Sequence, residues 1–151
     1  FIDASDLSGA IRGRHNLYMH LETMIKKAEK NVVIMTTSKG LVRKVDSLKP
    51  ELERLAKKGI KIKIAAPITK DSSAVIKDLS KIAEIRNVNK INARFCIVDN
   101  KEIMFMVKDD EEVHPTYDIG VWISTPYFAN ALSSMFEMAW KDMQPLDKVK
   151  L

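Results

Sequence analysis

Two hydroxyl-rich loops follow apolar segments of the sequence. The first is 36–40, Thr-Thr-Ser-Lys-Gly, and the second is 69–73, Thr-Lys-Asp-Ser-Ser. Where a strand passes into a helix, free backbone N–H groups and nearby hydroxyls can hold an anion, although the same hydroxyls can simply cap the helix. Ligands of open α/β sheets collect beyond the carboxyl ends of strands, which favours a binding site near both loops. The candidate residues of the first loop are Thr36, Thr37, Ser38 and Lys39.

The remaining reactive residue types give little support for a metal site or a nucleophile. His15 and His20 are five residues apart, so they do not share one helix face, and His114 lies in an acidic loop. The acidic run 109–112 lacks the spacing of a calcium loop and is interpreted as solvated. Cys96 is the one cysteine, which excludes an intramolecular disulfide and a Cys-rich zinc site. We therefore expect no metal, no cofactor and no enzymatic activity.

Composition and charge limit the classes of protein to which this chain can belong. The chain has 151 residues, 17.2 kDa and a formal charge of +5, which suits one globular domain with a mildly basic surface. Residues 39–63 carry nine Lys/Arg against three Asp/Glu. A solvated helix face explains this stretch, and a nucleic-acid surface is the alternative. No apolar run approaches the roughly 20 residues that a membrane helix needs, and the lone cysteine fits a reducing compartment, so we expect a cytoplasmic protein without membrane contact.

The apolar periodicity predicts the element order α-β-α-β-α-β-β-β-α. Helices between the early strands and a hairpin at Asp99-Asn100 indicate an α/β fold with a mixed, mostly parallel sheet and helices on both faces. Pro50 predicts a break near Lys49 in the second helix. The predicted helices are 13–30, 41–58, 74–85 and 126–143, and the predicted strands are 32–35, 60–64, 88–98, 103–107 and 117–123.

The predicted domain boundary lies near residue 13. Residues 1–12 show little pattern, and we interpret them as a lead-in from a missing N-terminal region. Residues 13–151 then form a single domain. Because the chain begins at Phe1 rather than Met, we expect a fragment of a larger protein.

Aromatic and methionine side chains in the second half of the chain are interpreted as core rather than as the lining of a ligand cleft, because they recur at helical and strand spacing. They are Met104, Met106, Trp122, Met135, Phe136, Met138 and Trp140.

The segment Asn92-Ala-Arg94-Phe-Cys-Ile-Val-Asp99 resembles the His-x-Lys-x4-Asp motif of phospholipase D-type phosphodiesterases. In that family the His attacks phosphorus and the Lys neutralises phosphate charge. Here Asn92 stands at the His position, Arg94 at the Lys position, and Asp99 is kept. The family's following Gly-Ser-x-Asn has no counterpart, because 106–109 reads Met-Val-Lys-Asp.

These replacements remove the family's chemistry but keep a capacity to bind. An amide cannot form a covalent phosphoenzyme or move a proton near neutral pH, whereas an arginine still binds phosphate or carboxylate in a bidentate manner. The resemblance also implies that Arg94 lies near the two hydroxyl loops. Asn92 and Arg94 therefore join the candidate binding residues.

A second resemblance rests on segments outside this motif. They are Gly13-Arg14 opening a helix, Ile25-x-x-Ala28, the strand Val32–Ile34, Lys57–Lys63, the strand Asp118–Ile123, and Phe136-x-x-x-Trp140. Together they resemble the phospholipase D-like domain of TrmB-type transcriptional regulators, over about Gly13 to Met143. Those regulators are mainly archaeal and join this domain to an N-terminal winged helix that binds DNA.

This second resemblance implies a non-catalytic domain that senses a small polar or anionic effector and pairs as a homodimer, with DNA bound through a domain outside this chain. Two alternatives stay open: an inactive or residual phosphodiesterase or nuclease half, and a purely structural oligomerisation module.

Overall fold

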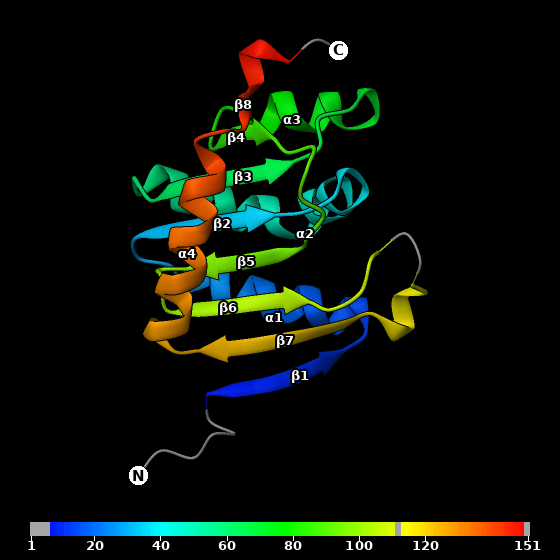
Figure 1. Cartoon of the computed structure of the whole chain (residues 1–151), viewed down its shortest axis with the longest axis vertical. Helices are drawn as coiled ribbons and strands as arrows, with labels where there is room; N and C mark the ends of the chain where they lie inside the picture. The colour runs from blue at the N-terminus through cyan, green and yellow to red at the C-terminus, as the bar shows by residue number, and fades with distance from the viewer. Residues whose placement is uncertain (1–6, 111–112, 150–151) are drawn as a thin grey trace.

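The apolar segments of the chain gather into one twisted sheet. The computed structural model describes residues 7–110 and 113–149, without the side chains of residues 45 and 46. Within this part, eight strands lie in the order β1-β7-β6-β5-β2-β3-β4-β8 (Figure 1). The strands are β1 (Ser8–Arg12), β2 (Asn31–Met35), β3 (Lys61–Ala66), β4 (Glu84–Asn87), β5 (Phe95–Val98), β6 (Glu102–Met106), β7 (Ile119–Ser124) and β8 (Gln144–Pro145).

The sheet is mixed but mostly antiparallel, so the prediction of a mostly parallel sheet was wrong. Only β2–β3 and β3–β4 pair in parallel among the described strands, while the other neighbouring pairs are antiparallel. Helical crossovers connect β2 to β3 and β3 to β4, and such crossovers produce parallel neighbours. From β5 onward the chain returns through a tight turn and a loop, and both β5 and β8 join the parallel strands in the opposite direction.

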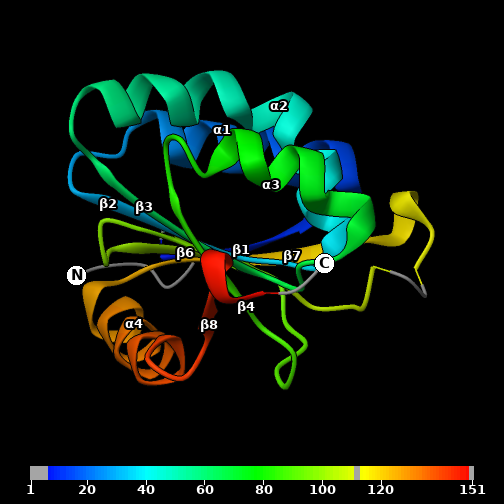
Figure 2. The same cartoon turned by 90° about the horizontal axis from the view of Figure 1, so that it is seen from above.

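Four α-helices cover the sheet, α1 (Arg14–Lys26), α2 (Ser38–Lys57), α3 (Ser73–Leu79) and α4 (Pro126–Trp140). Figure 2 shows α1, α2 and α3 on one side of the sheet and α4 on the other. The core is divided accordingly: α1 and α2 bury leucines such as Leu17 and Leu48 on the first face, while α4 buries Phe136 and Trp140 on the second.

The hairpin predicted at Asp99-Asn100 is confirmed, and it joins β5 to β6. Both turn residues have positive φ angles, 56° and 54°, which Asp and Asn tolerate better than most residues. The Asp99 carboxylate also accepts hydrogen bonds from the backbone N–H groups of Glu29, Lys30 and Asn31, at 3.0, 2.7 and 3.1 Å. It thereby ties the β5–β6 turn to the entry of β2.

Two predictions for the helices, a break near Pro50 and a helix over 74–85, were wrong. Pro50 does not break the second helix, because α2 continues through it with Pro50 on the exposed side and Leu48 and Leu52 buried. A proline inside a helix costs about 3 kcal/mol, and burial of several leucines at about 1.5–3 kcal/mol each outweighs that cost. The helix predicted over 74–85 ends at Leu79 instead, because residues 84–87 hydrogen-bond to β3 as strand β4.

Residues 8–12 belong to the sheet rather than to a lead-in. They form β1, which pairs antiparallel with β7 from Ser8 opposite Ile123 to Arg12 opposite Ile119. The predicted boundary at residue 13 therefore cuts through the folded unit, although residues 1–6 lie outside the described part. The sequence did not predict this strand, because its five residues are mostly exposed and show no apolar alternation.

The methionines and aromatic residues divide into two groups. Met104, Met106, Phe136 and Trp140 are buried as predicted. The prediction was wrong for the two methionines of α4 on its outer face, since Met135 and Met138 keep 66% and 71% of their side-chain area exposed. Among the described residues, none of the helices has both the length and the apolar character needed to cross a membrane.

Candidate functional site

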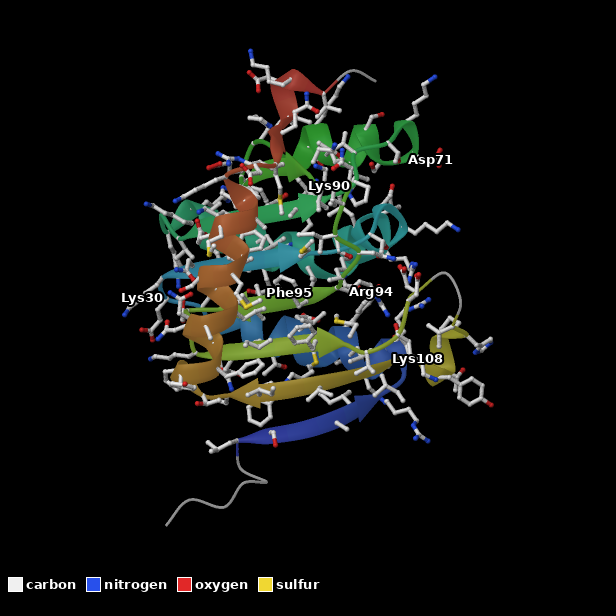
Figure 3. All side chains as sticks on the ribbon, in the orientation of Figure 1. Lys30, Asp71, Lys90, Arg94, Phe95 and Lys108 are labelled. Atoms are coloured by element: carbon white, nitrogen blue, oxygen red, sulfur yellow. The ribbon has the colours of Figure 1, made fainter. Side chains whose placement is uncertain are left out.

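A small polar pocket lies where β2 ends and β5 begins. Because these two strands are antiparallel and Met35 pairs with Phe95, the residues after β2 meet the residues before β5 at one edge of the sheet. The pocket has a volume of about 120 Å³. Figure 3 places Arg94 and Lys108 at this edge and Lys30 at the opposite one. The residues that line the pocket are Thr37, Asn92, Ala93, Arg94, Met106, Val107, Lys108 and Asp109.

Arg94 forms the back wall of the pocket and is held by Asp118. Its Nη1 and Nη2 atoms donate to the two carboxylate oxygens of Asp118 at 3.0 and 2.8 Å, and Nη2 also donates to the backbone oxygen of Lys108. The Arg94 and Asp118 side chains are 4% and 0% exposed. The buried Nε atom of Arg94 has no hydrogen-bond partner among the described residues, so one donor of the guanidinium remains unused.

Asp118 remains a carboxylate despite its burial. Burial by itself would raise the pKa of Asp118, but the hydrogen bonds and positive charges of Arg94 and Arg14 outweigh this effect and lower the pKa below its usual value. Arg14, at the start of α1, reaches Asp118 Oδ2 through its Nε atom at 3.2 Å. The carboxylate therefore joins α1 to Arg94, the residue just before β5.

A second ion pair is joined to the pocket through Thr37. Arg43 of α2 donates to Asp110 Oδ2 at 2.8 Å, and the Thr37 hydroxyl donates to the same oxygen at 2.7 Å. Burial would raise the pKa of Asp110, and the Thr37 hydrogen bond together with the charges of Arg94 and Arg43 lowers it. The acidic run 109–112, predicted to be a solvated loop, thus contributes a buried carboxylate; residues 111–112 lie outside the description.

Lys44 is a buried cation behind the pocket. It is 5% exposed, and its Nζ atom donates to Thr36 Oγ1 at 2.7 Å. Burial, with a smaller contribution from the neighbouring charge of Arg94, lowers the pKa of Lys44 to about 7. Its position was open to prediction, because Lys44 lies three residues after Leu41 and four before Leu48, on the apolar face of α2.

The two hydroxyl loops predicted to share a crevice do meet. Ser38 Oγ lies 2.8 Å from Thr69 Oγ1, so the loop after β2 contacts the loop after β3. Thr37 caps α2, since its Oγ1 accepts a hydrogen bond from the Gly40 N–H at 2.9 Å. Most of these hydroxyls therefore serve the helix caps, which was the ordinary alternative, while Thr37 also faces the pocket.

The six predicted binding residues are distributed unevenly around the site. Thr37, Asn92 and Arg94 line the pocket. Thr36 is buried behind it, Ser38 contacts the second loop, and Lys39 is exposed on the first turn of α2 without lining the pocket. The sequence analysis missed Lys44, Arg43, Arg14, Asp110 and Asp118 as parts of the surrounding network.

The acid of the recognised motif lies far from the pocket. Asp99 follows the last residue of β5, whereas Asn92 and Arg94 precede its first residue. The four residues of β5 separate the two ends by about 13 Å at 3.3 Å per residue. Asn92 stays at the mouth, where its Nδ2 atom lies 3.4 Å from Asp109 Oδ2.

The arrangement can bind an anion or a polar molecule but offers no nucleophile of the expected kind. Three arginines, Arg14, Arg43 and Arg94, lie around the pocket or in the network behind it, together with the buried Lys44. Their charges are opposed by the buried carboxylates of Asp110 and Asp118 and by Asp109, which lines the pocket. Arg14 Nη2 and Arg43 Nη1 are also buried without partners among the described residues. No lining residue is a histidine, and no cluster of three or more metal-ligating side chains occurs in the described ranges.

Solved structures with the same fold define the structural class. NucT from Helicobacter pylori has a TM-score of 0.70 at 15% identity, over 92% of this chain and 98% of that one. Nuc from Salmonella typhimurium, a phospholipase D family member, has a TM-score of 0.67 at 14% identity, over 91% and 97% of the two chains. The chain therefore has a phospholipase D-like fold.

The family follows from the sequence itself. The model described as "Transcriptional regulator TrmB, EBD N-terminal subdomain" matches residues 9–144, and the chain belongs to this family. TrmBL2, an archaeal chromatin protein described as having a novel mode of DNA binding, has a TM-score of 0.71 at 20% identity. The alignment covers 93% of this chain and 54% of TrmBL2, so the chain spans about half of that protein's length. The comparison with curated proteins gave no match.

Proposed function

We propose that this domain is the non-catalytic, effector-sensing part of a TrmB-type transcriptional regulator. Its family and the polar pocket beside Arg94 support this function. The observation that carries the proposal is the unused, buried Nε donor of Arg94 at a pocket that Thr37 and Asn92 also line. DNA would be bound by a winged-helix domain outside this chain, and the regulator would act in the cytoplasm of an archaeal cell.

The effector is a small anion or a small molecule that carries one anionic group. A volume of about 120 Å³ is well below the 300–1,000 Å³ of sites for drug-sized ligands. Arg94 and Lys108 supply positive charge against the carboxylate of Asp109, which also lines the pocket, and the Asn92 amide can both donate and accept a hydrogen bond. A larger effector would place only its anionic group in the pocket.

Calorimetric titration and thermal unfolding in the presence of inorganic phosphate, sulfate, organic phosphates and neutral sugars test this proposal. A ligand specific for the folded state raises the melting temperature, by several degrees at 100 times its dissociation constant. Asn92→Ala and Lys108→Ala should weaken binding about tenfold with little change in stability. Asn89→Ala and Lys101→Ala, outside the pocket, are the matched controls. If no compound of the panel binds, the structural-module alternative replaces the proposal.

The absence of catalysis is part of the same proposal. Asn92 cannot act as a nucleophile toward phosphorus, and a phosphodiesterase of this fold would need that nucleophile. We therefore expect no hydrolysis of bis-(p-nitrophenyl) phosphate above the buffer rate. The measurement tests phosphodiester hydrolysis because the chain has a phospholipase D-like fold. Turnover that Asn92→Ala abolishes would support the residual phosphodiesterase instead.

Pairing of two copies also belongs to the proposal. A phospholipase D-type site joins two motif-bearing halves, and this chain carries one such motif. Sedimentation velocity at micromolar concentrations tests the pairing, and a monomer throughout would remove it.

A further inference from the structure

Helix α4 is apolar on two opposite faces. Ala129, Phe136 and Trp140 are buried against the sheet, as expected for a helix that covers it. The outer face carries Tyr127, Phe128, Ala131, Met135 and Met138, here called the outer α4 face. Of these, Tyr127, Phe128, Met135 and Met138 are 88%, 42%, 66% and 71% exposed. A helix that covers one face of a sheet normally has a polar outer side, so the exposed apolar side chains of the outer α4 face favour a second packing partner.

The spacing of this face is that of a helix-pairing seam. Phe128, Ala131, Met135 and Met138 are separated by three, four and three residues, which is the a/d spacing of coiled coils. Such residues insert between those of a facing helix. The partner that this spacing fits is therefore another helix rather than a flat surface or a small molecule.

Charge favours a second copy of the same helix. Glu137 is the one charged residue in the sequence of α4, and its carboxylate is bound by Lys63 Nζ at 2.9 Å. Two copies of α4 can therefore approach without like charges facing each other. At the second position of the helix, Tyr127 projects freely enough to reach across to a partner.

The order of side-chain sizes indicates an antiparallel pair. When two copies of α4 run in opposite directions about a two-fold axis, Phe128 faces Met138 and Ala131 faces Met135. Each large side chain then meets a smaller or more flexible one, and methionine sulfur packs well against an aromatic ring. In a parallel pair Ala131 would face Ala131, which leaves a gap between the Phe128 layer and the Met135 layer.

The area is sufficient for a dimer. At roughly 200 Å² for each large side chain, the four exposed residues offer about 500 Å² per copy and about 1,000 Å² for a pair. This is the lower limit of a specific protein–protein interface, before any contribution from neighbouring elements. An apolar patch of this size lies near the upper end of what a monomer exposes, and such patches are often functional.

We propose that the outer α4 face is the homodimer interface, formed by two antiparallel copies of α4. This assignment rests on the proposed pairing of two copies but not on the effector pocket, because neither Met135 nor Met138 lines that pocket. Loss of the interface and loss of effector binding are therefore separate outcomes.

Sedimentation velocity across a concentration series, on the complete chain, tests the proposal. Met135→Glu should raise the dimer dissociation constant about 30-fold or more, as truncation of a central contact residue does. Asn130→Glu adds the same charge to an exposed position of α4 outside the apolar face and should leave the constant unchanged. Far-ultraviolet circular dichroism verifies that both variants fold.

A mixing experiment distinguishes the antiparallel arrangement. Ala131→Lys and Met135→Glu should each be monomeric alone, and a 1:1 mixture should associate because the introduced lysine of one chain faces the introduced glutamate of the other. A mixture that stays monomeric would overturn the antiparallel arrangement. A Met135→Glu variant that dimerises like the wild type would overturn the interface itself, and a monomeric wild-type chain would overturn the pairing.

Discussion

Arg94 has a structural role beside its candidate role in binding. Its guanidinium neutralises the buried carboxylate of Asp118 through two hydrogen bonds, while its Nε atom stays unused beside the pocket. A substitution at this residue therefore changes stability and binding together. For this reason Asn92 and Lys108, rather than Arg94, are the better reporters of an effector.

We predict that Arg94→Ala lowers the free energy of unfolding by about 3–5 kcal/mol, because it leaves the buried Asp118 with Arg14 as its remaining cationic partner. Arg94→Lys keeps the charge but loses the bidentate geometry, so its loss should be smaller. Urea unfolding measures both. A loss below 1 kcal/mol for Arg94→Ala would mean that the ion pair contributes little.

Lys44 predicts an unusual dependence of stability on pH. Its pKa is about 7 in the folded protein and about 10.4 in an unfolded chain. Between these values the unfolded chain binds a proton that the folded chain does not, so raising the pH favours the folded state. The free energy of unfolding should rise from pH 7 to pH 9, by at most about 1.4 kcal/mol per pH unit.

Lys44→Met isolates this effect because it keeps a similar volume and removes the charge. The variant should be more stable than the wild type at pH 7, and the difference should shrink as the pH rises. Urea unfolding of both proteins at pH 7, 8 and 9 measures it. Parallel curves for the two proteins would show that Lys44 stays charged when folded.

Among the elements, the β5–β6 hairpin depends on Asp99. We predict that Asp99→Ala destabilises the protein by about 1–2 kcal/mol, because several backbone N–H groups before β2 lose their acceptor in a mostly exposed setting. Asp99→Asn keeps one acceptor oxygen and should lose about half as much. Hydrogen exchange should increase at residues 29–31 in both variants. Unchanged exchange there would contradict the proposed tie.

The sequence predicted those elements whose signal is local. The buried run of β2, the Asp-Asn hairpin and the proline at the start of α4 all have short-range causes, and all three are present. Strand direction is decided by pairing between distant segments, so the antiparallel insertion of β5 beside β2 was missed. The exposed edge strand β1 was missed because it carries no apolar alternation.

The candidate site was predicted in outline. The resemblance to a known motif predicted Asn92 and Arg94 as binding residues, and the hydroxyl-rich loop predicted Thr37. The structure brings these three residues to one pocket. The ion-pair partners could not be predicted, because Asp118 lies 24 residues from Arg94 and Asp110 lies 67 residues from Arg43, and folding alone brings each pair together.

Across the whole molecule, ion pairs reduce the basic character of residues 39–63. Lys49 bonds Asp78 and Lys63 bonds Glu137, and because both carboxylates lie outside residues 39–63, they compensate part of the local excess of six positive charges.

We predict that this chain alone binds duplex DNA weakly and without sequence preference. Its dissociation constant should fall in the non-specific range of about 10⁻⁴ to 10⁻⁶ M and should rise steeply with salt. Fluorescence anisotropy with two unrelated duplexes at low and physiological salt measures this. A clear preference for one duplex would place DNA recognition within this domain.

The length of β5 explains why the spacing of a sequence motif can be kept when the residues that carry its chemistry are replaced. Arg94 and Asp99 flank the two ends of β5, so the number of residues between them is the length of this strand. One inserted residue would turn every following side chain of β5 to the other face and uncouple its turn from β2. Architecture alone is therefore enough to preserve the interval, and a genome search that uses this interval will recover chains with other residues at the His and Lys positions together with chains that carry the complete motif.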